Sequence, residues 1–174
     1  MFVDIRNFSH FASLASPEEI YNYQQLIFPQ LIDLVYQHSG FVHQILGDGF
    51  LALFSETNES VSKINALSTA TKLIDSFQDI SKNANFTSQL GIGLHFGNIL
   101  IHQINHPFYQ KILISGWPII IARRLEQLNK KFNSQVLTTE EVLNNSNNFK
   151  NKAKFLGKFP IKNSNHHEKI WQLA

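Results

Sequence analysis

Cysteine is absent from this chain of 174 residues. Its absence excludes disulfide bonds, thiolate metal sites and thiol nucleophiles, and it is typical of a cytoplasmic protein. Long apolar runs are also missing, since none approaches the roughly 20 residues that cross a bilayer. The N-terminus lacks the basic and then apolar layout of a secretory signal. We therefore expect no membrane segment in this chain and a cytoplasmic location.

Strong charge of either sign is missing as well. The formal net charge is +2, and the lysines and arginines are scattered along the chain. Such a weak basic balance argues against a nucleic-acid partner. Apolar residues, in contrast, make up 43% of the chain, which is enough to bury a substantial core. We expect residues 1–174 to form a single domain.

The most informative stretch of the sequence is Phe41–Phe54. Two runs rich in β-branched and aromatic residues flank Gly47-Asp48-Gly49, and Asp-Gly between apolar runs is a strong signal for a β-hairpin. The stretch therefore predicts a hairpin with the Asp48 carboxylate at its tip.

A second carboxylate, that of Asp4, follows the strand-like residues Phe2-Val3. Pairing of this strand with the hairpin would bring Asp4 and Asp48 together at one edge of a sheet. Two carboxylates placed in this way form a site for a hard cation. The alternative is structural: Asp4 caps the turn that follows it, and Asp48 only makes the hairpin.

The first two predicted helices enclose the hairpin in the sequence. Ser16-Pro17-Glu18-Glu19 has a Ser N-cap, Pro in the first turn and Glu placed for a capping box. Apolar residues then recur every three or four positions until Gly40. Apolar residues from Val61 to Ile80 predict a second helix with the same periodicity.

Glycines alternate with large residues from Leu90 to Phe96, which predicts a strand with one nearly bare face. We expect a second strand, Ile99 to Ile104, to return from it as a hairpin through Gly97-Asn98. The elements then follow the order β-α-β-β-α-β. This order predicts an α+β sandwich with a ferredoxin-like core, in which helices cover a mixed or antiparallel sheet.

The remaining elements follow from shorter patterns. A short strand is predicted at Lys111–Ser115, a helix from Gly116-Trp117-Pro118 to about Lys131, a short helix at Glu140–Asn144 and closing strands within Phe155–Leu173. Asn144–Asn151 has low complexity and is predicted to be a mobile loop. The histidines show no zinc-type spacing, and His43 and His95 are predicted to be packed strand residues.

Four separated motifs resemble, in order and spacing, those of the class III adenylate/guanylate cyclase catalytic domain. They are Phe2–Ser9, Gly40–Phe50, Gly91–Gly97 and Ala122–Glu126. The resemblance extends over nearly the whole chain. It implies a domain that forms cAMP or cGMP from ATP or GTP in intracellular signal transduction.

In the resemblance, Asp4, the backbone carbonyl of Ile5 and Asp48 hold two Mg²⁺ or Mn²⁺ ions. The loop that begins with Arg6, Asn7 and Phe8 would face the β- and γ-phosphates through its backbone amides.

Further positions come from the same resemblance. Arg124 aligns with the arginine that stabilises the transition state, and Lys162 with a lysine that binds the triphosphate. Three other positions depart from the family: Gln44 and Leu113 stand where cyclases contact the base, and Ile120 where an asparagine orients the ribose.

These departures are not scattered at random. In the family, one protomer of a head-to-tail pair supplies the metal carboxylates, while the other supplies the base contacts, the asparagine and the arginine. This chain keeps the first set and departs from most of the second. The resemblance therefore implies the metal-bearing half of a dimeric site, in a heterodimer or a homodimer of weak activity.

Two other interpretations remain open from the sequence. One is a catalytically silent dimerisation module of the same family. The other is a palm-like nucleotidyl transferase with the same two carboxylates, which would need a basic nucleic-acid groove.

The helix after Pro118 predicts where a partner binds. Ile120 and Arg124 are four residues apart and share one helical face, whereas Ile121, Leu125 and Leu128 line the face that packs on the sheet. An apolar patch of Trp117, Ile119 and Ile120 is then expected at the surface, covered by a second chain. Phe108-Tyr109 is predicted to add a further partner contact. A head-to-tail homodimer would bury about 1,200 Å² or more.

Overall fold

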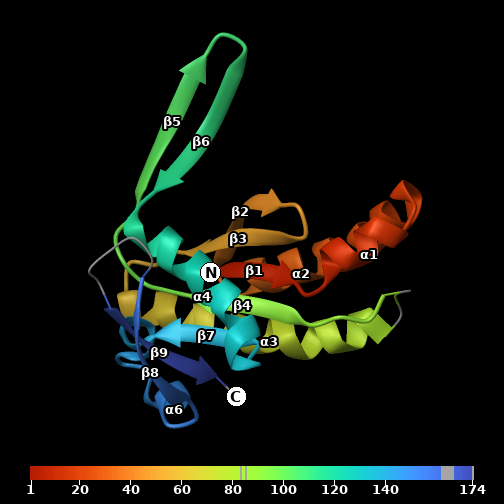
Figure 1. The fold of residues 1–174 in the computed structure, drawn as a ribbon. Coiled ribbons are helices and arrows are strands. Elements are labelled where there is room, and N and C mark those ends of the chain that lie inside the picture. The colour runs from red at the N-terminus through yellow and green to blue at the C-terminus, as the bar shows by residue number, and fades with distance from the viewer. Residues whose placement is uncertain (83, 85, 162–166, 174) are drawn as a thin grey trace.

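A seven-stranded mixed sheet carries the fold (Figure 1). The structure is a computed structural model that describes residues 1–82, 84, 86–161 and 167–173. The strand order is β2-β3-β1-β4-β7-β9-β8. Only β4 and β7 pair in parallel, and every other neighbouring pair in this sheet is antiparallel. The strands are β1 (Phe2–Ile5), β2 (Gly40–Leu46), β3 (Gly49–Phe54), β4 (Leu90–Leu94), β7 (Val136–Thr139), β8 (Lys154–Pro160) and β9 (His167–Leu173).

Helices cover both faces of this sheet, as the alternation of side chains requires. Val3 and Ile5 of β1 belong to the core cluster formed with α2 and α3, whereas Phe2 packs with Ala122 of α4. Asp4 points to the same face as Phe2, because successive side chains of a strand point to opposite faces. The helices are α1 (Phe8–Leu14), α2 (Pro17–Gln37), α3 (Glu59–Lys82), α4 (Trp117–Phe132), α5 (Glu140–Leu143) and α6 (Asn147–Lys150).

The N-terminus of α2 forms the predicted capping box. The Glu19 amide donates to Ser16 Oγ at 3.2 Å, and the Ser16 amide donates to the Glu19 carboxylate at 2.7 Å. Ile27 and Leu31 of this helix are fully buried against the sheet that carries Asp4 and Asp48. The predicted β-α-β-β-α-β order and the α+β class are confirmed.

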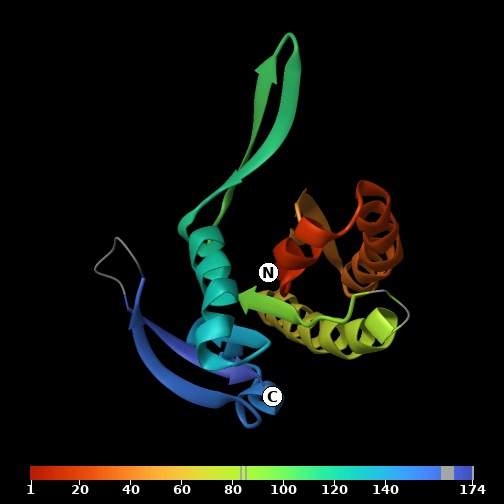
Figure 2. The ribbon, with the colours of Figure 1, turned by 45° about the vertical axis from the view of Figure 1, so that its right-hand side comes forward.

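One predicted pairing is wrong. β5 (Leu100–His106) does not return along β4, because both edges of β4 are taken by β1 and β7. It pairs instead with β6 (Tyr109–Ser115) in a separate two-stranded sheet. This arm projects away from the seven-stranded sheet in both views (Figures 1 and 2). Every residue of β5 is exposed, so the arm has no core of its own.

Three other features of the secondary structure differ from the sequence predictions. β6 begins two residues earlier than the predicted strand, and β7 was not predicted because its four residues are too few to show a periodicity. The segment predicted as a loop contains α6. No described helix has the length and apolar character needed to span a membrane.

Candidate active site

The end of β1 and the β2–β3 turn place Asp4 beside Asp48. Asp4 lies opposite Gly49, the first residue of β3, and the Ile5 amide donates to the Asp48 carbonyl at 3.1 Å. Gly47 in the turn has φ of 68°, a left-handed conformation that glycine adopts at little cost. The backbone therefore fixes both carboxylates at one edge of the sheet, as the sequence predicted.

The two carboxyl groups are in direct contact. The Asp4 carboxyl hydrogen-bonds the Asp48 carboxylate. Burial is the largest cause that raises the pKa of Asp4 to about 6, and the neighbouring charge of Asp48 adds to it. A second negative charge at this point is costly unless a proton or a cation lies between the two groups.

A cleft of about 550 Å³ opens over this pair. Its lining includes Ile5, Asn7 and Phe8 beside the two aspartates, and residues of α4 on the other side. Asn7 has φ of 59° and precedes α1. All three residues predicted to contact the metals line this cleft, and so do Asn7 and Phe8 of the four predicted for the triphosphate. Arg6 does not line it, and Lys162 lies outside the described residues.

Arg6 differs from its neighbours in the loop. Its amide donates to the Gln89 carbonyl at 2.8 Å, so this amide is already used within the protein. Its guanidinium donates to the Ser134 carbonyl at 3.1 Å. We predicted a phosphate contact through the Arg6 amide, and this geometry argues against it: Arg6 links the loop after Asp4 to the protein interior.

The sequence interpretation missed a third carboxyl group and a lysine of the cleft. Glu126 and Lys130 of α4 both line it, and Glu126 is only 8% exposed. Burial is the largest cause that raises the pKa of Glu126 to about 7, and the charge of Asp4 raises it further. The positive charge of Lys130 acts to lower the pKa of both Asp4 and Glu126.

A sequence signal for these residues existed. Arg123, Glu126 and Lys130 recur at helical spacing, and all three line the cleft. This spacing places the three charged side chains on one face of the helix, which indicates a polar face that a sequence motif alone does not identify. Gly91 of β4 leaves the space in which Glu126 and the Arg6 side chain converge, because a Cβ there would lie 2.9 Å from Arg6 Nε and 3.0 Å from Glu126 Oε1.

The other predicted site residues do not line this cleft. Gln44 lies half-buried in β2, Leu113 lies half-buried in β6, and Ile120 is 53% exposed on α4. Arg124 Nη1 donates to Gln127 on its own helix at 3.4 Å, and its Nε is buried without a hydrogen bond. Within one chain, the structure therefore separates the carboxylates of Asp4 and Asp48 from the residues predicted to contact the base and the ribose.

The donor chemistry of the cleft fits hard divalent cations. Two adjoining carboxylates and a backbone carbonyl are oxygen ligands of the kind that Mg²⁺ and Mn²⁺ prefer. A cation between Asp4 and Asp48 would also remove the repulsion that raises the Asp4 pKa. The residues that would hold it are Asp4, Ile5 and Asp48, with Glu126 next to them.

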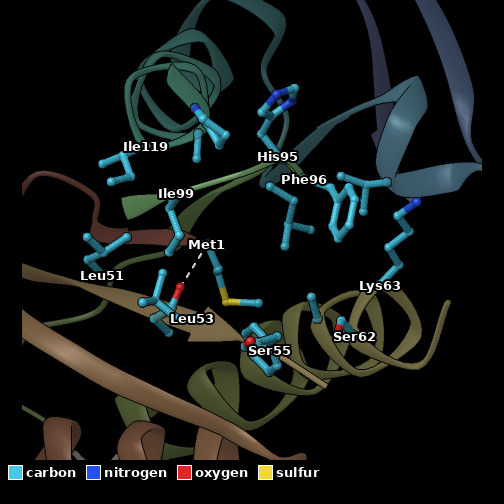
Figure 3. Close-up of a pocket in the computed structure, with 18 of the residues that line it drawn as sticks. Met1, Leu51, Leu53, Ser55, Ser62, Lys63, His95, Phe96, Ile99 and Ile119 are labelled. Atoms are coloured by element: carbon cyan, nitrogen blue, oxygen red, sulfur yellow. Dashed lines mark hydrogen bonds between the residues drawn. The ribbon is translucent and has the colours of Figure 1, made fainter. Parts of the chain in front are cut away.

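A second cavity, of about 350 Å³, lies at the other end of β4. Its lining is largely apolar and includes Leu53, Phe96 and Ile119 (Figure 3). Lys63 of α3 reaches over the Phe96 ring, with Nζ 4.0 Å from its centroid. None of the predicted site residues that the structure describes lines this cavity.

Comparison with known families gives one match over the full chain. The profile of the adenylate and guanylate cyclase catalytic domain matches residues 1–174. An adenylate cyclase of Anabaena cylindrica is 24% identical over 150 residues, which cover 83% of this chain and 30% of the relative. A cytidylate cyclase of Escherichia coli is 26% identical over 143 residues, which cover 75% of this chain and 32% of the relative. The chain thus spans about a third of the length of these relatives.

Solved structures show the same fold. The crystal structure of the guanylyl cyclase Cya2 superposes with a TM-score of 0.85 at 18% sequence identity. The superposition covers 99% of this chain and 89% of the other.

Proposed function

The chain belongs to the adenylate and guanylate cyclase catalytic domain family, and from this premise we propose that residues 1–174 form one nucleotide cyclase domain. It would convert a nucleoside triphosphate, ATP or GTP, to a cyclic nucleotide with two Mg²⁺ or Mn²⁺ ions. We further propose that the chain supplies the metal-bearing half of a dimeric site in intracellular signal transduction, in the cytoplasm where these nucleotides are made and used.

One observation carries this proposal: the contact between the Asp4 and Asp48 carboxyl groups in a cleft that Arg124 and Ile120 do not line. Cyclisation requires the ribose 3′-hydroxyl to attack the α-phosphate while pyrophosphate leaves. Metal ions would lower the charge on the phosphates and orient them. Lys130 lies in the same cleft and would add positive charge there.

The roles of the protein residues follow from their positions. Asp4, the Ile5 carbonyl and Asp48 hold the cations, and Asn7 and Phe8 lie where the phosphates would extend from them. Glu126 is placed to hold a proton near Asp4, since its pKa is raised to about 7. Arg124 and the residue at position 120 would act on the substrate held by a partner.

Dimerisation is supported by the exposed face of α4. Ile120 is 53% and Trp117 is 38% exposed, whereas Ile121 and Leu125 of the same helix are fully buried. The arm adds Phe108, which is 93% exposed. We propose that a second chain covers this face, as a head-to-tail homodimer or as a heterodimer with another cyclase domain.

A second candidate function is a silent dimerisation module. It is favoured by Ile120 and Leu113, because an apolar side chain at either position cannot hydrogen-bond a ribose or a base. Loss of a positioned polar group in comparable sites costs about a hundredfold or more in rate.

The first experiment separates the two functions by binding. We would titrate the purified chain with ATP, GTP and CTP in Mn²⁺ and measure heat, and then assay each cyclic product; CTP is included because one relative is a cytidylate cyclase. Mn²⁺-dependent binding supports the metal-bearing half-site. Absence of binding with all three nucleotides supports the silent module.

The second experiment tests the composite site by complementation. Asp48→Asn and Arg124→Ala would each remove one half of every site in a homodimer. Mixing the two variants makes some dimers with one complete site, and random pairing predicts recovery of about one quarter of the original activity. Recovery in the mixture supports the shared site. If each variant alone keeps its activity, the head-to-tail arrangement is wrong.

A further inference from the structure

Three chemically suitable side chains meet at the end of β4 opposite to the Asp4 edge. His95 follows β4, Glu141 belongs to α5 and Glu168 belongs to β9. One nitrogen of His95 and one carboxylate oxygen of each glutamate all lie within 4.8 Å of one another. These residues are so far apart in the sequence that no motif spacing could reveal the cluster.

The imidazole of His95 is held in position from behind. Its Nδ1 is 2.7 Å from Oγ1 of Thr139, and Thr139 is fully buried at the end of β7. A hydrogen bond at one ring nitrogen orients the other nitrogen, and this is the usual arrangement of histidines that bind metals. Burial lowers the pKa of His95 to about 4, so the ring is neutral at neutral pH.

The two elements that carry the glutamates are joined by a neighbouring ion pair. Glu140 of α5 binds Lys169 of β9 at 2.5 Å, and these residues are adjacent in sequence to Glu141 and Glu168. Val142 and Leu143 anchor α5 in the core, with at most 2% of either residue exposed. The ion pair and this packing hold α5 against β9, which places the two carboxylates next to His95.

We propose that His95, Glu141 and Glu168 form a second cation site that binds Zn²⁺ or a similar transition-metal ion. Zinc binds histidine nitrogen and carboxylate oxygen at about 2.0 to 2.2 Å, so the three donors must move together slightly around an ion. Glu141 is exposed and can make this movement. A solvent molecule would complete four-coordination.

This site is distinct from the cation site of the cleft. Asp4 lies opposite Gly91 in the pairing of β1 with β4. His95 lies four residues after Gly91, which at the rise of a strand is about 13 Å from Gly91. The donor sets also differ: imidazole favours Zn²⁺, whereas the all-oxygen set of the cleft favours Mg²⁺ or Mn²⁺. The inference is therefore independent of the proposed cyclase activity.

The test is a titration of the metal-free chain with zinc chloride, followed by calorimetry and thermal unfolding. We expect saturating Zn²⁺ at a hundredfold excess over Kd to raise Tm by about 5 to 10 °C. Mg²⁺ at the same concentration should not give this shift. The Glu141→Gln variant should bind Zn²⁺ at least tenfold more weakly, and the substitution leaves the core intact because Glu141 is exposed.

Two matched variants locate the site. Glu18→Gln changes an exposed glutamate of α2, and Asp48→Asn changes the cleft; both should keep Zn²⁺ affinity within about threefold. Equal Zn²⁺ affinity in the original chain and in Glu141→Gln would overturn the proposal. A loss of affinity in Asp48→Asn alone would overturn it too, because it would place the ion in the cleft.

Discussion

The buried side of α4 is flanked by two faces that differ in their side chains. One face carries Arg123, Glu126 and Lys130 into the cleft that contains Asp4. The other carries Ile120 and Arg124, which lie outside that cleft. The first face has several charged groups that interact with one another. The second has an exposed apolar residue, Ile120, and an arginine that donates a hydrogen bond to Gln127 of its own helix.

Under the proposed function, one face of this helix keeps its part in the site while the other departs from the family. The cleft face is constrained within the chain, because Glu126 interacts with Asp4 and Arg6. The Ile120 face makes few such contacts, so a substitution there leaves the fold of the protomer intact. If the proposed partner exists, a change that harms only the partner's site can accumulate on this face without a cost in stability.

The largest expected effect is on triphosphate binding, which should distinguish the cleft from the Ile120 face of α4. Asp48→Asn should weaken Mn²⁺-dependent triphosphate binding by about a hundredfold or more, because it removes a carboxylate that would hold the cations. Arg124→Ala should change the same affinity by less than about twofold, because Arg124 is proposed to act on the transition state and not on the bound triphosphate. Calorimetry on both variants checks this prediction. Equal losses in the two variants would mean that Arg124 also holds the triphosphate before reaction.

The next effect is a loss of stability from the packing of α4 on β4, which involves both faces of the helix. A Cβ at Gly93 of β4 would overlap the Ala122 carbonyl oxygen and the Glu126 amide. Gly93→Ala should therefore push α4 away from the sheet and cost about 3 kcal/mol of unfolding free energy, which lowers Tm by about 6 to 12 °C. Urea denaturation measures the loss.

Gly47→Ala provides the control for Gly93→Ala. A Cβ at Gly47 meets nothing within 4 Å, so only its φ of 68° opposes the substitution. The expected cost is about 1 kcal/mol. If Gly47→Ala is the more harmful of the two, the close contact between α4 and β4 is not the dominant constraint.

A smaller effect should appear on the Ile120 face. Ile120→Asn would restore a hydrogen-bonding group at the position that the family uses for the ribose, and we expect the rate of product formation to rise about tenfold. Ile120→Leu keeps the apolar character and should leave the rate unchanged. Single-turnover assays with ATP and GTP compare the variants. A gain in both variants would be attributed to packing rather than to polarity.

The smallest effect is the pH-dependent contribution that the cleft face makes to stability. The pKa of Asp4 is raised from 3.8 to about 6 and that of Glu126 from 4.5 to about 7. Each folded group binds its proton more tightly than the unfolded chain does, so the contribution of these two groups to the stability of the metal-free protein should fall as pH rises from about 4 to about 7. His95, with a pKa lowered to about 4, and the Met1 amino group, with a pKa lowered to about 5, contribute in the opposite direction. Urea unfolding in a chelator measures this slope.

Glu126→Gln is the matched control for the pH effect. It removes one of the two cleft groups, so the change of stability with pH should become less negative or more positive above pH 4.5 than in the original chain. Added Mn²⁺ should offset the loss at high pH, because the cation replaces the protons. A slope that Glu126→Gln leaves unchanged would show that other groups cause it.

The sequence predicted the cleft better than the arm, and the reason is physical. Asp4 and Asp48 lie on a strand and a turn with strong local signals, so their contact follows from one strand pairing. The pairing of β5 could not be predicted in this way, because it depends on β7 occupying the free edge of β4. β7 itself has only four residues and gives no periodicity.

The chemistry of the cleft was predicted only in part. Glu126 acts on Asp4 across the interface between α4 and β1, and this contact arises from tertiary packing over Gly91 and Gly93. The use of the Arg6 amide by Gln89 is a contact between residues 83 positions apart. Neither can be deduced from local patterns.

The β5–β6 arm has a consequence for how assembly can be followed. An isolated two-stranded hairpin is marginally stable in water, and the exposed tip residue Phe108 has no core beneath it. Such a segment is readily cut by chymotrypsin-like proteases unless another surface covers it. Cleavage near Phe108 should therefore slow as the chain concentration increases, so a protease can report assembly in the absence of any nucleotide.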